Sequence, residues 1–293
     1  STLLKVYELT LNRRLSTLAE SNGLLHDQQG GFRRWRRIEH HLFTLQHVLH
    51  KRKQKRTFVA FLDIKKAYDS VWRQLLWVKL DDQGIDGDLW AMVKSTYRSV
   101  VSTVRTREST SEPFEANVGV RQGSVLSPLL FNLFIDGLLA RLQKVNAGVT
   151  VAGQLLNGLL YADDVCLIAK SSAGMAALLK EAEGFAGENL LQFNPAKSAV
   201  LCFGRSQDEE TDGKWQISGE EIKQATSYTY LGVKLRDDGS WLQQSRSTAT
   251  NALQMLDTLG SLGLAGDDVP RSTTRLLFST FVFSVLSYAT AAL

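Results

Sequence analysis

Apolar positions along the chain follow two different periods. Near the start they recur at helical spacing, at Leu4, Leu11, Leu15 and Leu18, and the same spacing returns from about Trp35 to His50. Both stretches therefore predict helices. The run Phe58–Leu62 is continuously apolar. A short run of this kind is typical of a strand that is buried on both faces of a sheet.

The same patterns predict most of the remaining elements. Further helices are expected at Val71–Leu80, Leu89–Tyr97, Ser127–Leu142 and Ala173–Asn189, and in the last fifty residues. Ser127 followed by Pro128 is a helix-start signal, a capping Ser before Pro at the first helical position. Strands are expected at Leu155–Tyr161, Val165–Ala169 and Ala199–Phe203, with pairs formed by Val100–Arg105 and Phe114–Val120, and around Trp215–Ile217 and Tyr228–Leu235.

Strands and helices mix without strict alternation. This order favours an α+β fold, with an antiparallel sheet and helices packed on one face. The composition, 44% hydrophobic and 22% charged over 293 residues, is that of a globular protein and does not change this expectation. Polar residues interrupt the apolar stretch near the C-terminus. We therefore expect a soluble, intracellular protein with no membrane partner. Cys166 and Cys202 lie in apolar runs and are predicted to be buried thiols.

Positive charge is concentrated in one segment of the chain. Residues 33–56 hold nine Lys and Arg residues against one acid, Glu39, whereas the whole chain has a net charge of +4. Four of the arginines stand close together, Arg33, Arg34, Arg36 and Arg37. Such a block is either a solvated face or a surface that contacts phosphate groups.

Carboxylates stand at the ends of two apolar segments. Asp63 closes Phe58–Leu62, and the pair Asp163–Asp164 separates two predicted strands at hairpin spacing. Adjacent carboxylates repel each other unless a cation lies between them, and hard oxygen ligands suit Mg²⁺. Two ions about 3.5–4 Å apart can activate a hydroxyl and stabilise a leaving pyrophosphate. The alternative is that the Asp pair only serves a turn.

Three motifs around these carboxylates resemble the palm motifs of reverse transcriptases. They are, in the expected order, Ala60–Val71 (AFLDIKKAYDSV), Gly119–Pro128 (GVRQGSVLSP) and Tyr161–Asp164 (YADD). Asn194–Lys197, Tyr230–Gly232, Asn12–Leu15 and Gln29–Arg33 resemble further blocks of the family. The sequence AYDSV within the first motif, and the helical tail that ends in Leu286–Ser287–Tyr288, resemble those of the non-LTR (LINE-type) retrotransposon branch.

The resemblance implies roles for individual residues. Asp63, Asp163 and Asp164 would bind two Mg²⁺ ions, with Mn²⁺ as a substitute, together with the backbone carbonyl of Ile64. Lys197 is implied as the general acid for pyrophosphate. The residues implied to bind the nucleotide are Tyr68, as the gate that rejects a 2′-hydroxyl, and Arg121, Gln122 and Gly123. The residues implied to contact primer or template are Tyr161, Tyr230, Leu231, Gly232, Arg33, Arg34, Arg36 and Arg37. A role for Asp69 stays open, and the five histidines are expected to be solvated or to pack.

The fold implied by the resemblance is a right-hand polymerase. We expect basic, partial fingers over residues 1–56, a palm over 57–239 with a fingers insertion near 81–118, and a truncated helical thumb-like segment over 240–293. The implied function is RNA-directed DNA polymerase, with an RNA template, a DNA primer and deoxynucleoside triphosphates, acting in the nucleus.

Two alternatives to this function stay open. One is a weak or inactive nucleic-acid-binding remnant, and the other is a group II intron or retron-type enzyme. An Arg-Pro-Ile block and an endonuclease segment, both usual in the family, do not occur in the sequence. We therefore expect a fragment of a larger polypeptide, with doubtful activity of its own.

Overall fold

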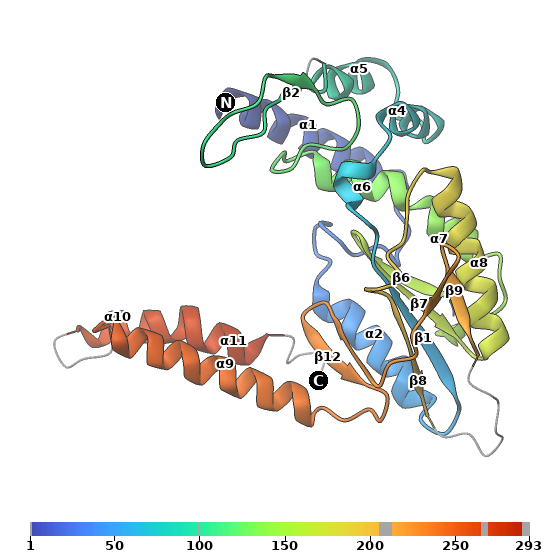
Figure 1. Ribbon diagram of the computed structural model, residues 1–293, viewed down its shortest axis with the longest axis vertical. Helices are drawn as coiled ribbons and strands as arrows, with labels where there is room; N and C mark the ends of the chain where they lie inside the picture. Colours follow the sequence, from blue (N-terminus) through green and yellow to red (C-terminus); the bar gives the residue numbers. More distant parts are fainter. Residues whose placement is uncertain (1, 99, 205–212, 265–268, 289–293) are drawn as a thin grey trace.

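The chain folds around a four-stranded antiparallel sheet, shown with its surrounding helices in the computed structural model of Figure 1. The structure describes residues 2–98, 100–204, 213–264 and 269–288. The helices are α1 (Thr2–Ser21), α2 (Ile38–Lys51), α3 (Ala67–Ser70), α4 (Arg73–Asp82), α5 (Gly87–Ser95), α6 (Ser127–Ile135), α7 (Gly137–Leu142), α8 (Ser172–Glu188), α9 (Leu242–Ser261), α10 (Arg271–Leu277), the π-helical η1 (Phe278–Phe283) and α11 (Ser284–Ser287). The strands are β1 (Thr57–Leu62), β2 (Val101–Ser102), β3 (Phe114–Glu115), β4 (Val149–Val151), β5 (Gln154–Leu156), β6 (Gly158–Tyr161), β7 (Asp164–Ala169), β8 (Ala199–Phe203), β9 (Trp215–Ile217), β10 (Glu220–Ile222), β11 (Ser227–Tyr230) and β12 (Val233–Arg236).

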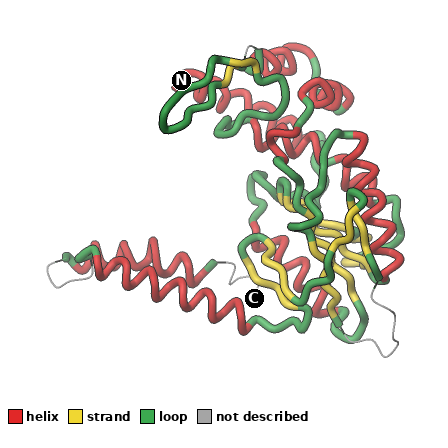
Figure 2. Tube along the Cα trace, in the orientation of Figure 1, coloured by secondary structure: helices red, strands yellow, loops and turns green. Residues whose placement is uncertain are grey.

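The sheet runs in the order β6-β7-β1-β8, and most strands of the molecule gather around it (Figure 2). All six residues of β1 are buried, as its continuous apolar run predicts. Side chains alternate between the two faces of the sheet. Phe58, Ala60 and Leu62 join one apolar cluster with α6, α7 and α8. Val59 and Phe61 join a second cluster on the opposite face, with α2 and the hairpin β11–β12.

The α+β class and the right-hand arrangement are confirmed. The expected helical layer consists of α6, α7 and α8, and α2 adds a cover on the other face (Figure 1). Helices α1, α4 and α5 lie together at one end of the sheet. At the other end, α9 and α11 extend away as a helical pair that encloses only a small apolar cluster around Ala252, Leu259 and Val282. The domain boundaries stay a prediction.

Three local predictions are wrong in detail. Ser127 does not cap α6: the cap position is Leu126, and the Ser127 hydroxyl donates to the carbonyl of Arg121 at 2.7 Å. The expected strand Leu155–Tyr161 breaks at Asn157, because its buried side chain donates to two carbonyls of the preceding segment. The strands β9 and β11 do not pair with each other, since each forms its own hairpin, with β10 and β12.

Cys166 is a fully buried thiol, as predicted, whereas Cys202 is only half-buried. Burial raises the pKa of Cys166 above its usual range. Among the described helices, none combines the length and the hydropathy that a membrane span requires.

His26 joins the loop after α1 to the junction of α6 and α7. Its backbone N–H donates to Asp136 Oδ1 at 3.0 Å, and its ring Nδ1 lies 2.5 Å from Asp136 Oδ2. The Asp136 side chain is buried. The hydrogen bond to Asp136 raises the pKa of His26 against the opposing effect of burial. The expectation that the histidines are solvated or pack is therefore wrong for His26, whereas His41 packs against Tyr161 as expected.

The His26–Asp136 pair gives a prediction for stability against pH. A folded-state pKa above the usual value near 6.5 means that the stabilisation is complete below pH 6.5 and is lost as pH rises through the higher folded pKa. We expect the melting temperature of the wild type to fall by roughly 1–3 °C more than that of His26→Gln between pH 6 and pH 8.5. Thermal melts across this range check the difference. Parallel curves for the two proteins would contradict the prediction.

Candidate active site

The pair Asp163–Asp164 occupies the tight turn between β6 and β7. Tyr161 pairs with Asp164 across the turn, and Ala162 adopts a left-handed conformation with φ of 56°. On the next strand Leu62 pairs with Val165, which places Asp63 beside Asp164 at the ends of adjoining strands. By alternation along their strands, Asp63 and Asp164 belong to the face of Phe61 and Cys166. The sheet register therefore brings together the three carboxylates that the sequence singled out.

The three carboxylates influence each other electrostatically. Burial, and next the charges of Asp163 and Asp63, raise the pKa of Asp164 to about 6. Burial, with a smaller contribution from Asp63, also raises the pKa of Asp163. The side chains of Asp163 and Asp164 are nevertheless exposed to solvent. Their raised pKa values therefore reflect protein packed around the carboxyl groups and not complete burial of the side chains. A cation would relieve this repulsion.

The segment Asn194–Ser198 is tied to Asp63 through the backbone. The Asn194 N–H donates to the Asp63 carbonyl at 2.8 Å, and the Asp63 N–H donates to Ser198 Oγ at 3.2 Å. Lys197 Nζ lies 4.0 Å from Asp63 Oδ2, on a side chain that is 69% exposed. The structure thus places Lys197 beside the carboxylates, as the sequence predicted.

The backbone bridge between Ile64 and Phe193 uses the Asp63 carbonyl and the Lys65 N–H. It does not use the carbonyl of Ile64.

Tyr68 lies between the carboxylates and the helical layer. Its ring stacks on Phe131, with centroids 5.1 Å apart. Burial, and next the charge of Asp163, raise the pKa of Tyr68 to about 12. Its hydroxyl is buried and has no hydrogen-bond partner within the described part of the chain. The half-buried ring is held by packing.

The segment Arg121–Gly123 lies next to Tyr68 and Asp69. Gln122 Nε2 donates to Asp69 Oδ1 at 3.0 Å, which gives Asp69 a structural contact. Gly123 has φ of 79°, and a Cβ there would meet open space. This backbone conformation favours glycine, since an L side chain is strained there. Arg121 forms an ion pair with Glu8, so its charge is already balanced.

Glu8 is a site residue that the sequence analysis missed. Its side chain is buried on α1, and it also accepts hydrogen bonds from Ser124 Oγ at 3.0 Å and the Val125 N–H at 3.2 Å. It fixes the loop that carries Gln122 to the first helix. One signal could have revealed it: a carboxylate stands in the apolar stripe formed by Leu4, Leu11 and Leu15.

Gln29 is a second missed residue. It is fully buried, and its Oε1 accepts from the N–H groups of Ala162 at 3.1 Å and Gly31 at 2.9 Å. The flanking backbone of residues 28–30 exchanges hydrogen bonds with Leu160 along the outer edge of β6. This segment closes the sheet edge and holds the turn that bears Asp163 and Asp164. The resemblance had singled out the block Gln29–Arg33, but it assigned no role to Gln29 itself.

The four clustered arginines do not form one free surface. The buried guanidinium of Arg33 binds Glu20 at 2.6 Å, so Arg33 is structural and the expectation of a phosphate contact is wrong for it. Arg36 pairs with Asp27 at 2.5 Å. Arg34 and Arg37 are exposed, with Arg34 lying over the Trp35 ring.

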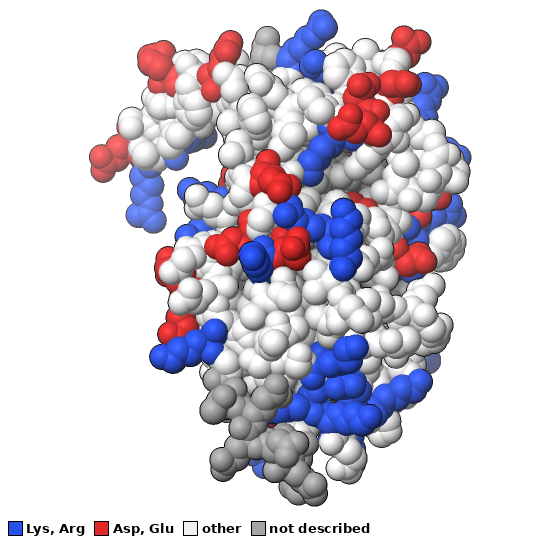
Figure 3. All heavy atoms as spheres, turned by 90° about the vertical axis from the view of Figure 1, so that its right-hand side faces the viewer, with Lys and Arg blue, Asp and Glu red and all other residues white. Residues whose placement is uncertain are grey.

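The other basic residues of this segment occupy the far end of α2. They are Lys51, Arg52, Lys53, Lys55 and Arg56. The whole helix α2 separates them from Arg33–Arg37. Figure 3 shows Lys and Arg side chains gathered on the lower part of one face, whereas both signs of charge mix higher up. The basic segment is therefore divided between two surfaces.

The predicted primer-side residues differ in exposure. Tyr230 is only 2% exposed and packs on Phe61, with centroids 5.0 Å apart, so it belongs to the core and cannot reach a primer as it lies. Leu231 and Gly232 form the turn that follows, and Tyr288 Oη donates to the Leu231 carbonyl at 2.9 Å. Tyr161 is half-buried, edge-on to His41 at 5.5 Å.

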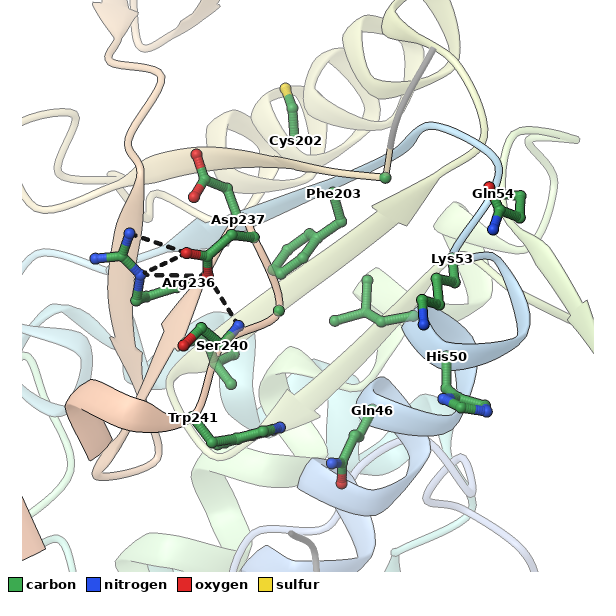
Figure 4. A pocket seen from close by; sticks show the side chains of 15 residues that line it. Gln46, His50, Lys53, Gln54, Cys202, Phe203, Arg236, Asp237, Ser240 and Trp241 are labelled. Carbon is green, nitrogen blue, oxygen red and sulfur yellow. Dashed lines mark hydrogen bonds and ion pairs between the residues drawn. The ribbon is translucent and has the colours of Figure 1, made fainter. Parts of the chain in front are cut away.

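A cavity of about 780 Å³ lies away from the carboxylates, between the end of α2, β8 and the segment Asp237–Trp241 (Figure 4). Its lining includes His50, Lys53 and Trp241, which Figure 4 labels. None of the predicted site residues lines it.

Comparisons with known proteins give matches to reverse transcriptases. Residues 1–235 match the family model "Reverse transcriptase (RNA-dependent DNA polymerase)". A retrovirus-related Pol polyprotein from the type-1 retrotransposable element R2 of Nasonia vitripennis is 31% identical over 189 residues, which are 62% of this chain and 18% of the relative. A probable RNA-directed DNA polymerase from transposon BS of Drosophila melanogaster is 27% identical over 88% of this chain and 29% of its own length.

A solved structure has a similar fold. Telomerase from Candida tropicalis, in complex with a TWJ fragment of telomeric RNA, has a TM-score of 0.59 at 14% identity, over 99% of this chain and 47% of that one. The chain thus spans less than a third of the two retrotransposon proteins and about half of the telomerase. The match over residues 1–235 shows that the chain belongs to the reverse transcriptase (RNA-dependent DNA polymerase) family, in the branch of the non-LTR retrotransposons.

Proposed function

We propose that this chain carries the catalytic centre of an RNA-directed DNA polymerase, which adds deoxynucleotides to a primer 3′-hydroxyl along an RNA template. One observation carries the proposal: Asp63 and Asp164 end adjoining strands, Asp163 lies in the same turn, and Lys197 Nζ lies 4.0 Å from Asp63. Family membership supports this class of reaction.

The donor set fits divalent metal ions. It consists of three carboxylates and the Ile64 carbonyl, all hard oxygen ligands, and burial, followed by the charges of Asp163 and Asp63, raises the pKa of Asp164 to about 6. As the side chains of the described residues lie, no three acidic, His or Cys groups converge at ligand distance, so binding requires the carboxylates to rotate. Two bound Mg²⁺ ions, or Mn²⁺ as a substitute, would lower the pKa of the primer hydroxyl and balance charge on the leaving pyrophosphate.

The remaining residues have separate tasks in this proposal. Lys197 donates a proton to the leaving pyrophosphate, since its ammonium group is exposed and close to the carboxylates. Tyr68 forms a rigid wall against the sugar, because its ring is fixed on Phe131. Gln122 and Gly123 line the nucleotide from the loop that Arg121 and Glu8 hold in place. The turn Leu231–Gly232, with Arg34 and Arg37 farther away, contacts primer and template.

Primer extension on an RNA template with Mg²⁺ tests the proposal directly. We expect incorporation by Asp163→Asn/Asp164→Asn to be lower than that of the wild type by roughly 100- to 1000-fold or more. The substitutions remove carboxylate ligands of the metal ions, which would balance the negative charge on the leaving pyrophosphate. RNA binding, measured by filter retention, should persist in both proteins. Equal incorporation by both would refute the assignment, and RNA binding without incorporation by either would identify a nucleic-acid-binding remnant.

A second prediction concerns stability without metal. The pKa of Asp164 is raised to about 6, so the folded state loses stability as pH rises from the ordinary value of 3.8 to about 6 and stays destabilised above it. Asp164→Asn should therefore melt at a higher temperature than the wild type at pH 7.5, and the difference should vanish near pH 4. Asp257→Asn, at an exposed carboxylate of α9, is the matched control. A lower melting temperature for Asp164→Asn at pH 7.5 would contradict the raised pKa of Asp164.

A third prediction concerns sugar selection. Tyr68→Val removes the ring that packs on Phe131, and we expect the preference for deoxynucleotides over ribonucleotides to fall by roughly 10- to 100-fold. Tyr68→Phe keeps the ring and loses only a hydroxyl without a hydrogen-bond partner, so it should retain the preference. Single-nucleotide incorporation kinetics with both sugars measure the ratio. An unchanged preference in Tyr68→Val would remove Tyr68 from this role.

A further inference from the structure

Tyr228 on β11 contacts both the sheet and the segment that carries Lys197. Its ring stacks on Phe61 of β1, with centroids 4.6 Å apart and planes 2° apart. Its hydroxyl donates to the backbone carbonyl of Lys197 at 3.2 Å. The stacked ring fixes the position of the hydroxyl oxygen, since this oxygen is bonded directly to the ring. Two parts of the chain that are 31 residues apart are thereby joined.

The surroundings of Tyr228 keep this hydroxyl protonated. Burial, and next the charges of Asp164 and Asp63, raise its pKa to about 12. At neutral pH the group is therefore a hydrogen-bond donor. The stacking on Phe61 places Tyr228 on the face of the sheet to which Asp63 and Asp164 belong.

The position of Lys197 depends on its backbone. The side chain is 69% exposed, so packing does little to hold the Nζ atom near Asp63. On one side the Asn194–Ser198 turn is tied to Asp63, through Asn194 and Ser198. On the other side the Lys197 carbonyl is held by Tyr228. Both contacts restrict the place from which the ammonium group extends.

We propose that Tyr228 is a positioning residue for Lys197. Its hydrogen bond holds Lys197, the proton donor, at a fixed place relative to Asp63 and to the turn Leu231–Gly232. The role rests on the proposed function of Lys197. The hairpin β11–β12 that carries Tyr228 also receives the Tyr288 hydroxyl at Leu231. The helical tail thus contacts the turn of the hairpin, and the first strand of the hairpin, β11, contacts Lys197.

Tyr228→Phe tests the role, because it keeps the stacked ring and removes only the hydroxyl. We expect kcat for single-nucleotide incorporation to fall about 5-fold, the effect of one ordinary hydrogen bond, with KM for the nucleotide unchanged. In a Lys197→Ala background the same change should cost nothing further, since the group to be positioned is gone. Thr229→Val, which removes a hydroxyl from the exposed next residue of β11, is the matched control.

Hydrogen–deuterium exchange of the peptide around 193–199 supplies a readout that does not need activity. It should exchange faster in Tyr228→Phe than in the wild type or Thr229→Val. Unchanged exchange, an unchanged kcat, or an equal loss with and without Lys197 would each overturn the proposal. An inactive wild type would overturn the proposed function, and with it the positioning role, whereas faster exchange would still report the contact between Tyr228 and Lys197.

Discussion

Mutual repulsion of three carboxylates is the constraint on which the centre of this molecule depends. Asp63, Asp163 and Asp164 are held close together, and burial, followed by the charges of Asp163 and Asp63, raises the pKa of Asp164 to about 6. The sheet prevents their separation. Strand β1 is buried along its whole length between β7 and β8, so the ends of the strands cannot move independently. The raised pKa of Asp164 means that this arrangement costs stability at neutral pH.

Support for the carboxylates comes from segments that contain no catalytic chemistry of their own. Gln29 accepts the N–H of Ala162 in the turn before Asp163, and it belongs to a segment that closes the edge of β6. Glu8 anchors the loop of Gln122 from the first helix. Arg73 donates to the carbonyls of Ala116, Val118 and Gly119, which fixes the segment that leads from β3 into the same loop. Each contact satisfies buried backbone groups, so its loss would leave polar atoms unpaired.

The second face of the sheet has a different task. The hairpin β11–β12 lies against Phe61, which is two residues before Asp63 on the same face of the sheet. It also contacts both Lys197 and the helical tail. The tail itself is held by a small apolar cluster, and large apolar side chains such as Leu253 and Phe283 are exposed on it. The hairpin therefore links the tail to the face of the sheet to which Asp63 and Asp164 belong.

The sequence by itself determined the elements whose signals are local. The apolar run before Asp63, the hairpin around Asp163–Asp164 and the helical tail follow from periodicity, because a buried strand or helix face leaves a mark within a few residues. The motifs around Asp63, Gln122 and Asp163 likewise identified the family and the carboxylates of the site. Fine detail was less secure, as the wrong cap at Ser127 shows.

Only the tertiary structure decided which polar side chains are free to act. Arg33 and Arg121 read as phosphate contacts in the sequence, yet each is paired with an acid, and the partner of Arg121 lies 113 residues away. Tyr230 reads as a primer contact, yet the fold of its hairpin buries it. The sequence can mark an unusual acid, as at Glu8 in its apolar stripe, but it does not show which residue that acid pairs with. The pairing depends on how helices and strands pack, because burial makes an unpaired charge costly and selects the partner that lies within reach.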